Sequence, residues 1–308
     1  MQTLYPKSEA DLIRIFEVAK ASGLTLSWGN RADPAFNPAL VPASSSNSKR
    51  LRFDSTKYLN QVLAFDATKR LIKVQPGVKL AQLNDFVRPH EMYLPICLPS
   101  AMASTDHTVG NLIHTNFKGS NFLQHGRIVH YVAAIDAVMA DAALVRFSTF
   151  GDGGDMAVTS ANMARLIPQL FIIAADYRKS IAAELGAYPW RDYGYNLDIF
   201  DVSAQIVRLY NPNQSLNLAH LLVGSFGQLA LPVRITLRLA PLPSVRADEA
   251  AKLGSHYELL QSQVAPKTKA NITFSTQLME AFGRVKQLFD PENRLNPIDA
   301  VSLGMKPE

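Results

Sequence analysis

Small and hydroxyl side chains are packed into the stretch from Leu94 to Gly126. The stretch has neither the 3.6-residue period of a helix nor the two-residue period of a strand, so a loop is predicted. Glycines let the backbone approach a ligand, hydroxyls form hydrogen bonds, and exposed amide groups can bind a phosphate. The residues concerned are Gly110, Gly119, Ser100, Ser104, Thr105, Thr108 and Thr115. Composition by itself favours an ordinary polar surface loop.

Four histidines, His107, His114, His125 and His130, lie in or beside this stretch. A metal site would need three or four ligands that converge from fixed elements. We therefore expect hydrogen-bonding loop residues and no metal. Cys97 is the single cysteine of the chain, which excludes an intramolecular disulfide and fits a reducing compartment. We expect it to be a small buried residue and not a catalytic thiol.

Other catalytic motifs fail on their spacing. The run Gly151–Asp155 has Met156 where a nicotinamide-binding G-x-G-x-x-G needs its last glycine. Val223 occupies the first glycine position of a serine hydrolase G-x-S-x-G elbow. The run from His90 to Leu94 lacks the second histidine of a zinc protease helix. These three enzyme classes are excluded.

Composition indicates a globular protein. The chain has 308 residues, 47% of them hydrophobic, and a net charge of +5. This length allows one large domain or two ordinary ones. Lys and Arg are scattered, so no nucleic-acid partner is expected. No apolar run approaches the roughly 20 residues that cross a bilayer, and the N-terminus has no leader pattern. We therefore expect a cytoplasmic protein without a membrane span.

Hydrophobic patterning predicts alternating helices and strands. Ser8 and Asp11 form a helix-start signal, and the apolar stripe that follows stops at Gly23. Helices are also predicted over 79–87 and over 161–185, the latter interrupted at Pro168. Strands are predicted over 24–28, 51–53, 61–65, 71–75 and 131–139.

Three groups of residues carry a family resemblance. The first is Pro99, Ser100, Thr108, Val109, Gly110, Asn116, Gly119 and Gly126. The second is Gly194-Tyr195-Asn196-Leu197, followed by residues 218–243 with Val223-Gly224-Ser225-Phe226-Gly227. The third is residues 285–297, VKQLFDPENRLNP. In this order they resemble FAD-linked oxidases of the vanillyl-alcohol-oxidase superfamily, with a PCMH-type flavin domain. The resembling branch contains D-2-hydroxyglutarate dehydrogenase, D-lactate dehydrogenase and glycolate oxidase.

The resemblance implies an α+β fold. It implies a PCMH-type FAD-binding domain made of two α+β subdomains, residues 1–75 and 76–245. A much reduced C-terminal cap with a terminal helix, residues 246–308, would follow. No substrate domain of ordinary size fits the roughly fifty residues between Pro243 and that helix.

The resemblance also implies noncovalent FAD and hydride transfer from a hydroxylated carbon to flavin N5. Ser100, Thr108, Gly110 and Gly119 would bind the pyrophosphate, and Gly224, Ser225 and Gly227 would line the isoalloxazine ring. The full set of implied cofactor-binding residues is Gly29, Asn30, Pro99, Ser100, Thr108, Val109, Gly110, Asn111, Asn116, Gly119, Gly126, Gly224, Ser225 and Gly227. Asn296 would approach the flavin or substrate from the C-terminal side, or else cap the turn before Pro297.

Several positions depart from the family pattern. The first phosphate loop, Trp28–Pro34, keeps one glycine, Asn111 replaces a second glycine, and Phe226 replaces a glutamate. The family's metal-binding His-x-Gly-Asp-Gly-Asn-x-His segment is absent. Two hypotheses follow. The chain is an FAD-dependent oxidoreductase for a small 2-hydroxy acid such as D-lactate, D-2-hydroxyglutarate or glycolate, or it is the flavin-binding subunit of one. In the second case another subunit completes the substrate site. Alternatively, it is a noncatalytic relative that acts as a structural or assembly partner.

Overall fold

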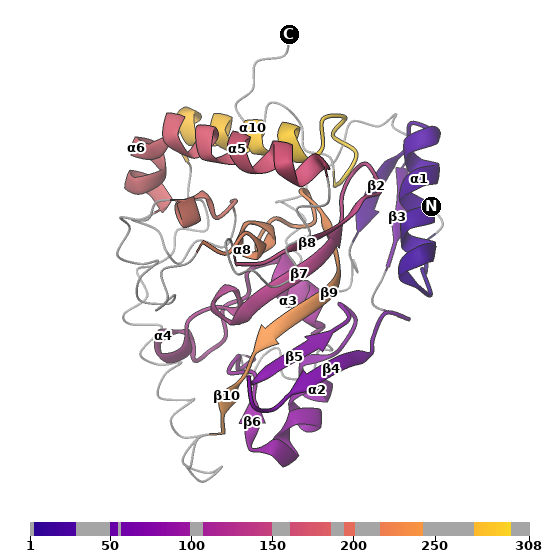
Figure 1. The fold of residues 1–308 in the computed structure, drawn as a ribbon, viewed down its shortest axis with the longest axis vertical. Helices are drawn as coiled ribbons and strands as arrows, with labels where there is room; N and C mark the ends of the chain where they lie inside the picture. Colours follow the sequence, from indigo (N-terminus) through magenta and orange to yellow (C-terminus); the bar gives the residue numbers. More distant parts are fainter. Residues whose placement is uncertain are drawn as a thin grey trace.

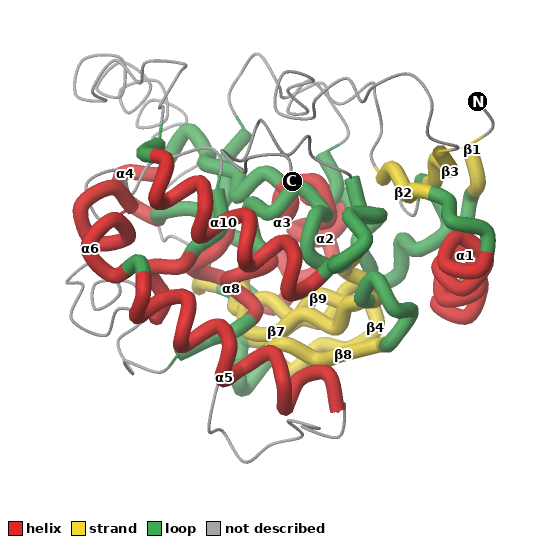
Figure 2. Tube along the Cα trace, turned by 90° about the horizontal axis from the view of Figure 1, so that it is seen from above, coloured by secondary structure: helices red, strands yellow, loops and turns green. Residues whose placement is uncertain are grey.

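The computed structural model describes residues 3–28, 50–54, 57–98, 107–149, 161–185, 194–200, 216–242 and 274–296. Within these ranges the strands form a three-stranded sheet, a five-stranded sheet and a two-stranded pair. Helices lie around the five-stranded sheet, and one further helix lies beside the three-stranded sheet (Figures 1 and 2). The predicted α+β class is therefore confirmed.

The three-stranded sheet contains the first elements of the chain, in the order β1-β3-β2 with parallel pairing. Its strands are β1 (Thr3–Leu4), β2 (Thr25–Trp28) and β3 (Arg50–Phe53), and helix α1 (Glu9–Ala21) connects β1 to β2. Helix α1 begins where predicted, because the Ser8 hydroxyl accepts a hydrogen bond from the Asp11 amide at 3.1 Å. Leu12, Phe16 and Ala19 form its buried face.

The five-stranded sheet is antiparallel, in the order β4-β5-β9-β7-β8. Its strands are β4 (Val62–Asp66), β5 (Leu71–Val74), β7 (Val132–Val138), β8 (Leu144–Phe147) and β9 (Leu231–Arg238). The central strand, β9, comes last in the sequence, so the sheet closes late along the chain. Strands β4 and β5 pair into this sheet, although the predicted boundary at residue 75 assigned them to the first subdomain. The division into domains stays a prediction.

The remaining elements surround this sheet. They are α2 (Leu80–Val87), α3 (Val109–His114), α4 (Phe122–His125), α5 (Ala161–Asp176), α6 (Arg178–Ser180), α8 (Ala219–Leu222), α10 (Thr276–Phe289), and the pair β6 (Met92–Tyr93) and β10 (Ala240–Pro241). Short helical turns span Arg88–His90, Ile128–Tyr131, Ile181–Leu185 and Leu197–Phe200. Helices α5 and α10 lie side by side across the top of Figure 1.

Three predictions from the sequence were wrong in detail. The stretch 94–126 is not all loop, because it contains α3 and α4. Helix α5 continues through Pro168, whose side of the helix faces solvent, so water can satisfy the carbonyl that proline leaves unpaired. Cys97 is exposed, not buried.

Apolar packing and a charge network join α1 to the five-stranded sheet. Leu12 and Phe16 share a buried cluster with Val138 and Val233. The Arg234 guanidinium lies 2.8 Å from a Glu9 carboxylate oxygen at the start of α1. Helix α1 therefore contributes to the contact between the two sheets, together with Leu26 of β2 and Phe53 of β3.

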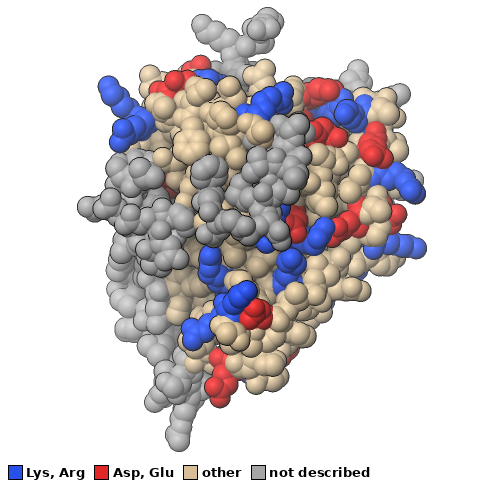
Figure 3. All heavy atoms as spheres, viewed as in Figure 1, with Lys and Arg blue, Asp and Glu red and all other residues tan. Residues whose placement is uncertain are grey.

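Charges of both signs are mixed on the face of the molecule that Figure 3 shows. On the side seen in Figure 3, Lys and Arg side chains alternate with Asp and Glu. None of the helices in the described ranges is long and apolar enough to cross a membrane.

Gly110 is expected to be essential for the close packing of α3. A Cβ at this position would lie 2.8 Å from the Pro76 Cβ and 2.9 Å from the Pro76 carbonyl oxygen. We expect Gly110→Ala to lower the free energy of unfolding by about 3 kcal/mol, since backbone atoms cannot move aside cheaply. Urea denaturation measures this change. Gly23→Ala is the control, because its added Cβ meets nothing within 4 Å. It should cost about 1 kcal/mol, from left-handed backbone strain. The reverse ranking of the two variants would contradict this packing argument.

Candidate functional site

Most of the cofactor-binding residues implied by the resemblance lie in the described ranges, in three separate places. Gly29, Asn30, Pro99 and Ser100 lie outside the described residues. Thr108, Val109, Gly110 and Asn111 form the start of α3. Asn116, Gly224, Ser225, Gly227 and Asn296 come together with His114. We call His114, Asn116, residues 224–227 and Asn296 the glycine-turn cluster.

The start of α3 is bound to the rest of the fold by its own amide groups. The Val109 amide donates to the Val78 carbonyl at 2.8 Å, and the Gly110 amide donates to the Pro76 carbonyl at 2.7 Å. The Asn111 amide donates to the Thr108 hydroxyl at 3.3 Å. These three donors are already paired. A pyrophosphate role for this segment therefore stays a prediction and would need other donors.

Gly119 and Gly126 serve local packing and are not part of the glycine-turn cluster. A Cβ at Gly119 would lie 2.7 Å from the Cys97 carbonyl oxygen. At Gly126, which has a φ of +74°, it would collide with the His130 ring. Both glycines are therefore explained by close packing within the chain.

Two backbone hydrogen bonds hold the glycine turn against the C-terminal end of α3. The Gly224 amide donates to the Ile113 carbonyl at 2.9 Å, and the Phe226 amide donates to the His114 carbonyl at 3.1 Å. A Cβ at Gly224 would lie 3.1 Å from the Asn116 Cβ. A side chain at Gly224 would therefore push the turn away from Asn116, which follows α3.

Left-handed backbone conformations gather at this cluster. Asn116, Phe226 and Asn296 have φ values of +45°, +52° and +39°, in addition to Gly224 and Gly227. Asn tolerates this region, whereas a bulky residue such as Phe is strained there. Such strain persists where surrounding contacts enforce it, often at functional sites. Here the Asn296 side-chain amide donates to the Phe226 carbonyl at 2.6 Å.

A buried acceptor in the cluster lacks a donor. Asn116 is 7% exposed, and its side-chain oxygen has no hydrogen-bond partner among the described residues. An unmet buried acceptor costs about 1–3 kcal/mol, so a ligand with a donor group would be stabilised here. His114 beside it has a pKa lowered to about 3 by burial, which keeps its ring neutral at pH 7. The cluster thus presents neutral polar groups and an unused acceptor.

Sequence reasoning missed Lys286, a buried ammonium beneath the cluster. Lys286 is 3% exposed. Its Nζ donates to the Gln228 carbonyl at 2.8 Å, the Leu295 carbonyl at 2.9 Å and an Asp290 carboxylate oxygen at 2.5 Å. The i,i+4 spacing of Lys286 and Asp290 was the available signal, but such pairs are usually exposed.

The segment 294–296 connects the cluster to β2. The Leu26 amide donates to the Arg294 carbonyl at 2.7 Å, and the Asn296 amide donates to the Leu26 carbonyl at 2.8 Å. Strand β2 leads directly to Gly29 and Asn30. Three segments that are distant in sequence, β2, the glycine turn and Asn296, therefore meet at one place.

The Gly-Tyr-Asn-Leu motif binds residues on both sides of the glycine turn in the sequence. The Tyr195 hydroxyl donates to the Gln228 side-chain oxygen at 3.0 Å. The Asn196 side-chain amide donates to the His220 and Val223 carbonyls, each at 2.9 Å. These residues therefore position the turn.

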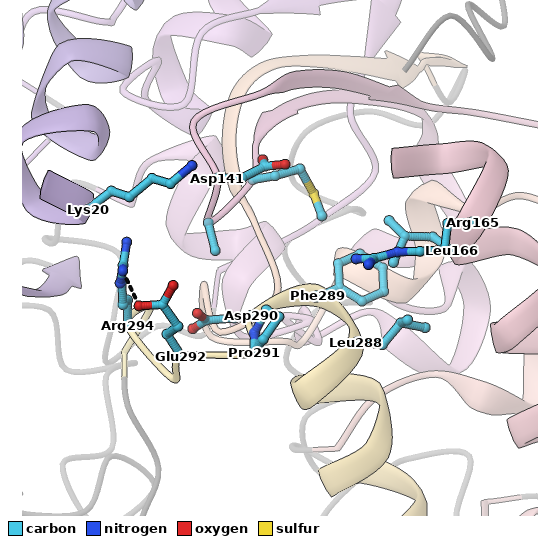
Figure 4. Close-up of a pocket in the computed structure, with 12 residues that line it drawn as sticks. Lys20, Asp141, Arg165, Leu166, Leu288, Phe289, Asp290, Pro291, Glu292 and Arg294 are labelled. Atoms are coloured by element: carbon cyan, nitrogen blue, oxygen red, sulfur yellow. Dashed lines mark hydrogen bonds and ion pairs between the residues drawn. The ribbon is translucent and has the colours of Figure 1, made fainter. Parts of the chain in front are cut away.

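Two other candidate features lie away from this site. No group of three or more His, Cys, Asp or Glu in the described ranges could hold a metal ion. A cavity of about 150 Å³ lies between α1, α5 and the end of α10, lined by charges of both signs (Figure 4). None of the implied cofactor-binding residues lines it.

The first part of the chain matches a known protein family. Residues 2–148 match the family model described as the FAD binding domain. Residues 2–148 belong to this family. The FAD-binding domain has FAD as its cofactor. The Asn116 oxygen, which has no partner among the described residues and lies beside Gly224, fits a ligand with a hydrogen-bond donor.

Curated relatives of the FAD-binding domain are dehydrogenases and oxidases. D-2-hydroxyglutarate dehydrogenase of Haemophilus influenzae is 26% identical over 255 residues, which cover 79% of this chain and 23% of the relative. D-lactate dehydrogenase of Archaeoglobus fulgidus is 31% identical over 123 residues, 35% of this chain and 27% of the relative. The chain thus spans about a quarter of these relatives. An alkyldihydroxyacetonephosphate synthase structure is similar at a TM-score of 0.48 and 13% identity, covering 79% of this chain and 32% of that one.

Buried histidines near the site make stability depend on pH. Burial lowers the folded-state pKa of His114 to about 3 and of His220 to about 4. The unfolded chain titrates near 6.5, so below that pH it binds protons that the folded protein excludes. We expect the free energy of unfolding to fall by about 1 kcal/mol per histidine between pH 6.5 and pH 5.5. Urea titrations at both pH values measure it.

His220→Gln keeps a side-chain donor for the Val132 carbonyl, which accepts from the His220 ring at 3.1 Å. This variant should reduce the pH dependence. If the free energy of unfolding of His220→Gln depended on pH as steeply as that of the wild type, the assignment of part of this dependence to His220 would be wrong.

Proposed function

We propose that this chain holds FAD at the glycine-turn cluster and serves as the flavin-bearing part of an oxidoreductase that oxidises a small 2-hydroxy acid. The membership of residues 2–148 in the FAD-binding domain family supports the cofactor. The observation that carries the proposed location is the meeting of β2, the glycine turn and Asn296. Beside Gly224 of this turn lies the Asn116 side chain, whose oxygen has no partner among the described residues.

The chain's own residues would bind and orient the cofactor. Gly224 and Gly227 carry no side chain that would project from the turn, and the Asn116 oxygen would accept a hydrogen bond from a ring N–H. Neutral His114 would leave no positive charge beside the ring. When bound, FAD supplies the hydride-accepting chemistry. Ser100, Gly29 and Asn30 remain our candidates for the phosphate groups.

The substrate class rests on the relatives. Those named D-2-hydroxyglutarate dehydrogenase and D-lactate dehydrogenase share a substrate type, with a hydroxyl on the carbon next to a carboxylate. The chain spans about a quarter of their length, so we propose that a second polypeptide completes the substrate site. A small 2-hydroxy acid would then bind between the two.

A second candidate is a noncatalytic flavin-domain relative that acts as an assembly partner. Two observations favour it: the amides at the start of α3 are paired within the chain, and Phe226 stands where the family has a glutamate. The two candidates differ in whether the purified protein binds FAD.

FAD binding to the purified protein tests the first candidate. We expect flavin absorbance, or saturable quenching of FAD fluorescence on titration. Asn116→Gly should weaken FAD binding about tenfold, because one hydrogen bond to a buried acceptor is worth about 1.5 kcal/mol. Glycine tolerates the φ of +45° at this position, so the fold should be retained. Asn293→Gly is the matched control, since Asn293 has a φ of +48° outside the cluster.

A protein that stays colourless and leaves FAD fluorescence unchanged would favour the assembly partner. Where FAD binds, anaerobic addition of D-lactate, D-2-hydroxyglutarate or glycolate tests the substrate class. If the substrate bleaches the oxidised flavin bound to this chain with no other polypeptide present, the chain is a complete enzyme. Loss seen with a copurifying partner, but not with the chain alone, would show a subunit.

A further inference from the structure

The buried ammonium of Lys286 bonds to both segments that enclose the glycine-turn cluster. One acceptor, the Gln228 carbonyl, directly follows the turn, and another, the Leu295 carbonyl, directly precedes Asn296. The third, Asp290, is 1% exposed and also accepts from the Leu295 amide at 2.7 Å. All three protons of the ammonium therefore have acceptors.

These bonds act at two residues that flank the site. Asn296 binds the Phe226 carbonyl through its side chain and the Leu26 carbonyl through its backbone amide. A shift of Leu295 would therefore move Asn296 relative to both β2 and the turn. Loss of the Gln228 contact would at the same time free the end of the turn.

We infer that Lys286 is a positioning residue for the proposed flavin site: it holds the glycine turn and Asn296 in contact, and so fixes the shape of the surface that they form together. The inference rests on the proposed function. A purely structural lysine would be unusual at this depth, because apolar residues of similar volume stabilise a core at least as well as a buried ion pair. The neighbouring buried positions of α10, Phe282, Val285 and Phe289, are apolar.

Lys286→Met tests this inference, because methionine preserves the volume and removes the three donated bonds. We expect amide hydrogen exchange at Leu26 and Asn296 to accelerate at least tenfold more than exchange at Ile135 in β7. We expect the Kd for FAD to rise about tenfold. Arg284→Met is the matched control on the same helix: it removes the 2.7 Å ion pair with Asp176 at an exposed position. It should change neither measurement.

Further variants distinguish the outcomes. Asn296→Ala leaves the ammonium contacts intact and should reproduce the loss of FAD affinity. If Lys286→Met does not fold, Asp290→Asn decides, because it keeps an oxygen for the Leu295 amide and neutralises the partner carboxylate. Local exchange and FAD affinity equal to wild type in the folded variant would overturn the inference, and so would uniform acceleration at all amides. If wild-type protein does not bind FAD, the proposed function fails, while the exchange measurement on the apoprotein still tests the positioning role.

Discussion

The ammonium of Lys286 is the interaction on which the arrangement of the proposed site depends. Moving a charge out of water costs several kcal/mol unless it is fully paired and hydrogen-bonded. Burial lowers the pKa of Lys286, and the neighbouring Asp290 carboxylate opposes that shift. Two backbone carbonyls complete the set of acceptors. Because these carbonyls belong to Gln228 and Leu295, the pairing of the charge also fixes two loop segments that have no regular secondary structure.

Hydrogen bonds on both sides of Phe226 maintain the backbone strain at the glycine-turn cluster. Phe226 in the left-handed region costs roughly 1 kcal/mol or more, and a flexible turn would relax it. The Asn296 amide on the Phe226 carbonyl and the His114 carbonyl on the Phe226 amide prevent that relaxation. The strained turn is therefore held from both sides, by α3 and by the segment after α10.

The sequence predicted much of the regular structure because period and end signals are local. Strands β2, β3, β4, β5 and β7 and helices α1 and α2 lie within a residue or two of their predicted bounds. Helix α3 was missed because all six of its residues are buried, so it shows no amphipathic period. The start of α3 appeared to offer free amides for a phosphate. Its pairing with Pro76 and Val78 depends on tertiary contacts that no local pattern reveals.

The candidate site shows the same division between local and distant information. Motif resemblance named Asn116, Gly224, Gly227 and Asn296, and the structure brings them together, although their binding role stays a proposal. Lys286 escaped notice because a charged residue on a helix is expected to face solvent. Its burial could be seen once Leu295 and Gln228 were placed on either side of it.

The order of the sheet explains why the end of the chain completes the site. Strand β9 lies between β5 and β7, so the five-stranded sheet cannot close before residues 231–238 are in place. The glycine turn immediately precedes this strand. Segment 294–296 then pairs with β2, from the start of the chain. Since contacts between distant segments carry the largest loop-closure cost, a short C-terminal segment can assemble here only if its bonds are strong. The buried Lys286 contacts meet that requirement, because they hold Leu295 of this segment next to the glycine turn.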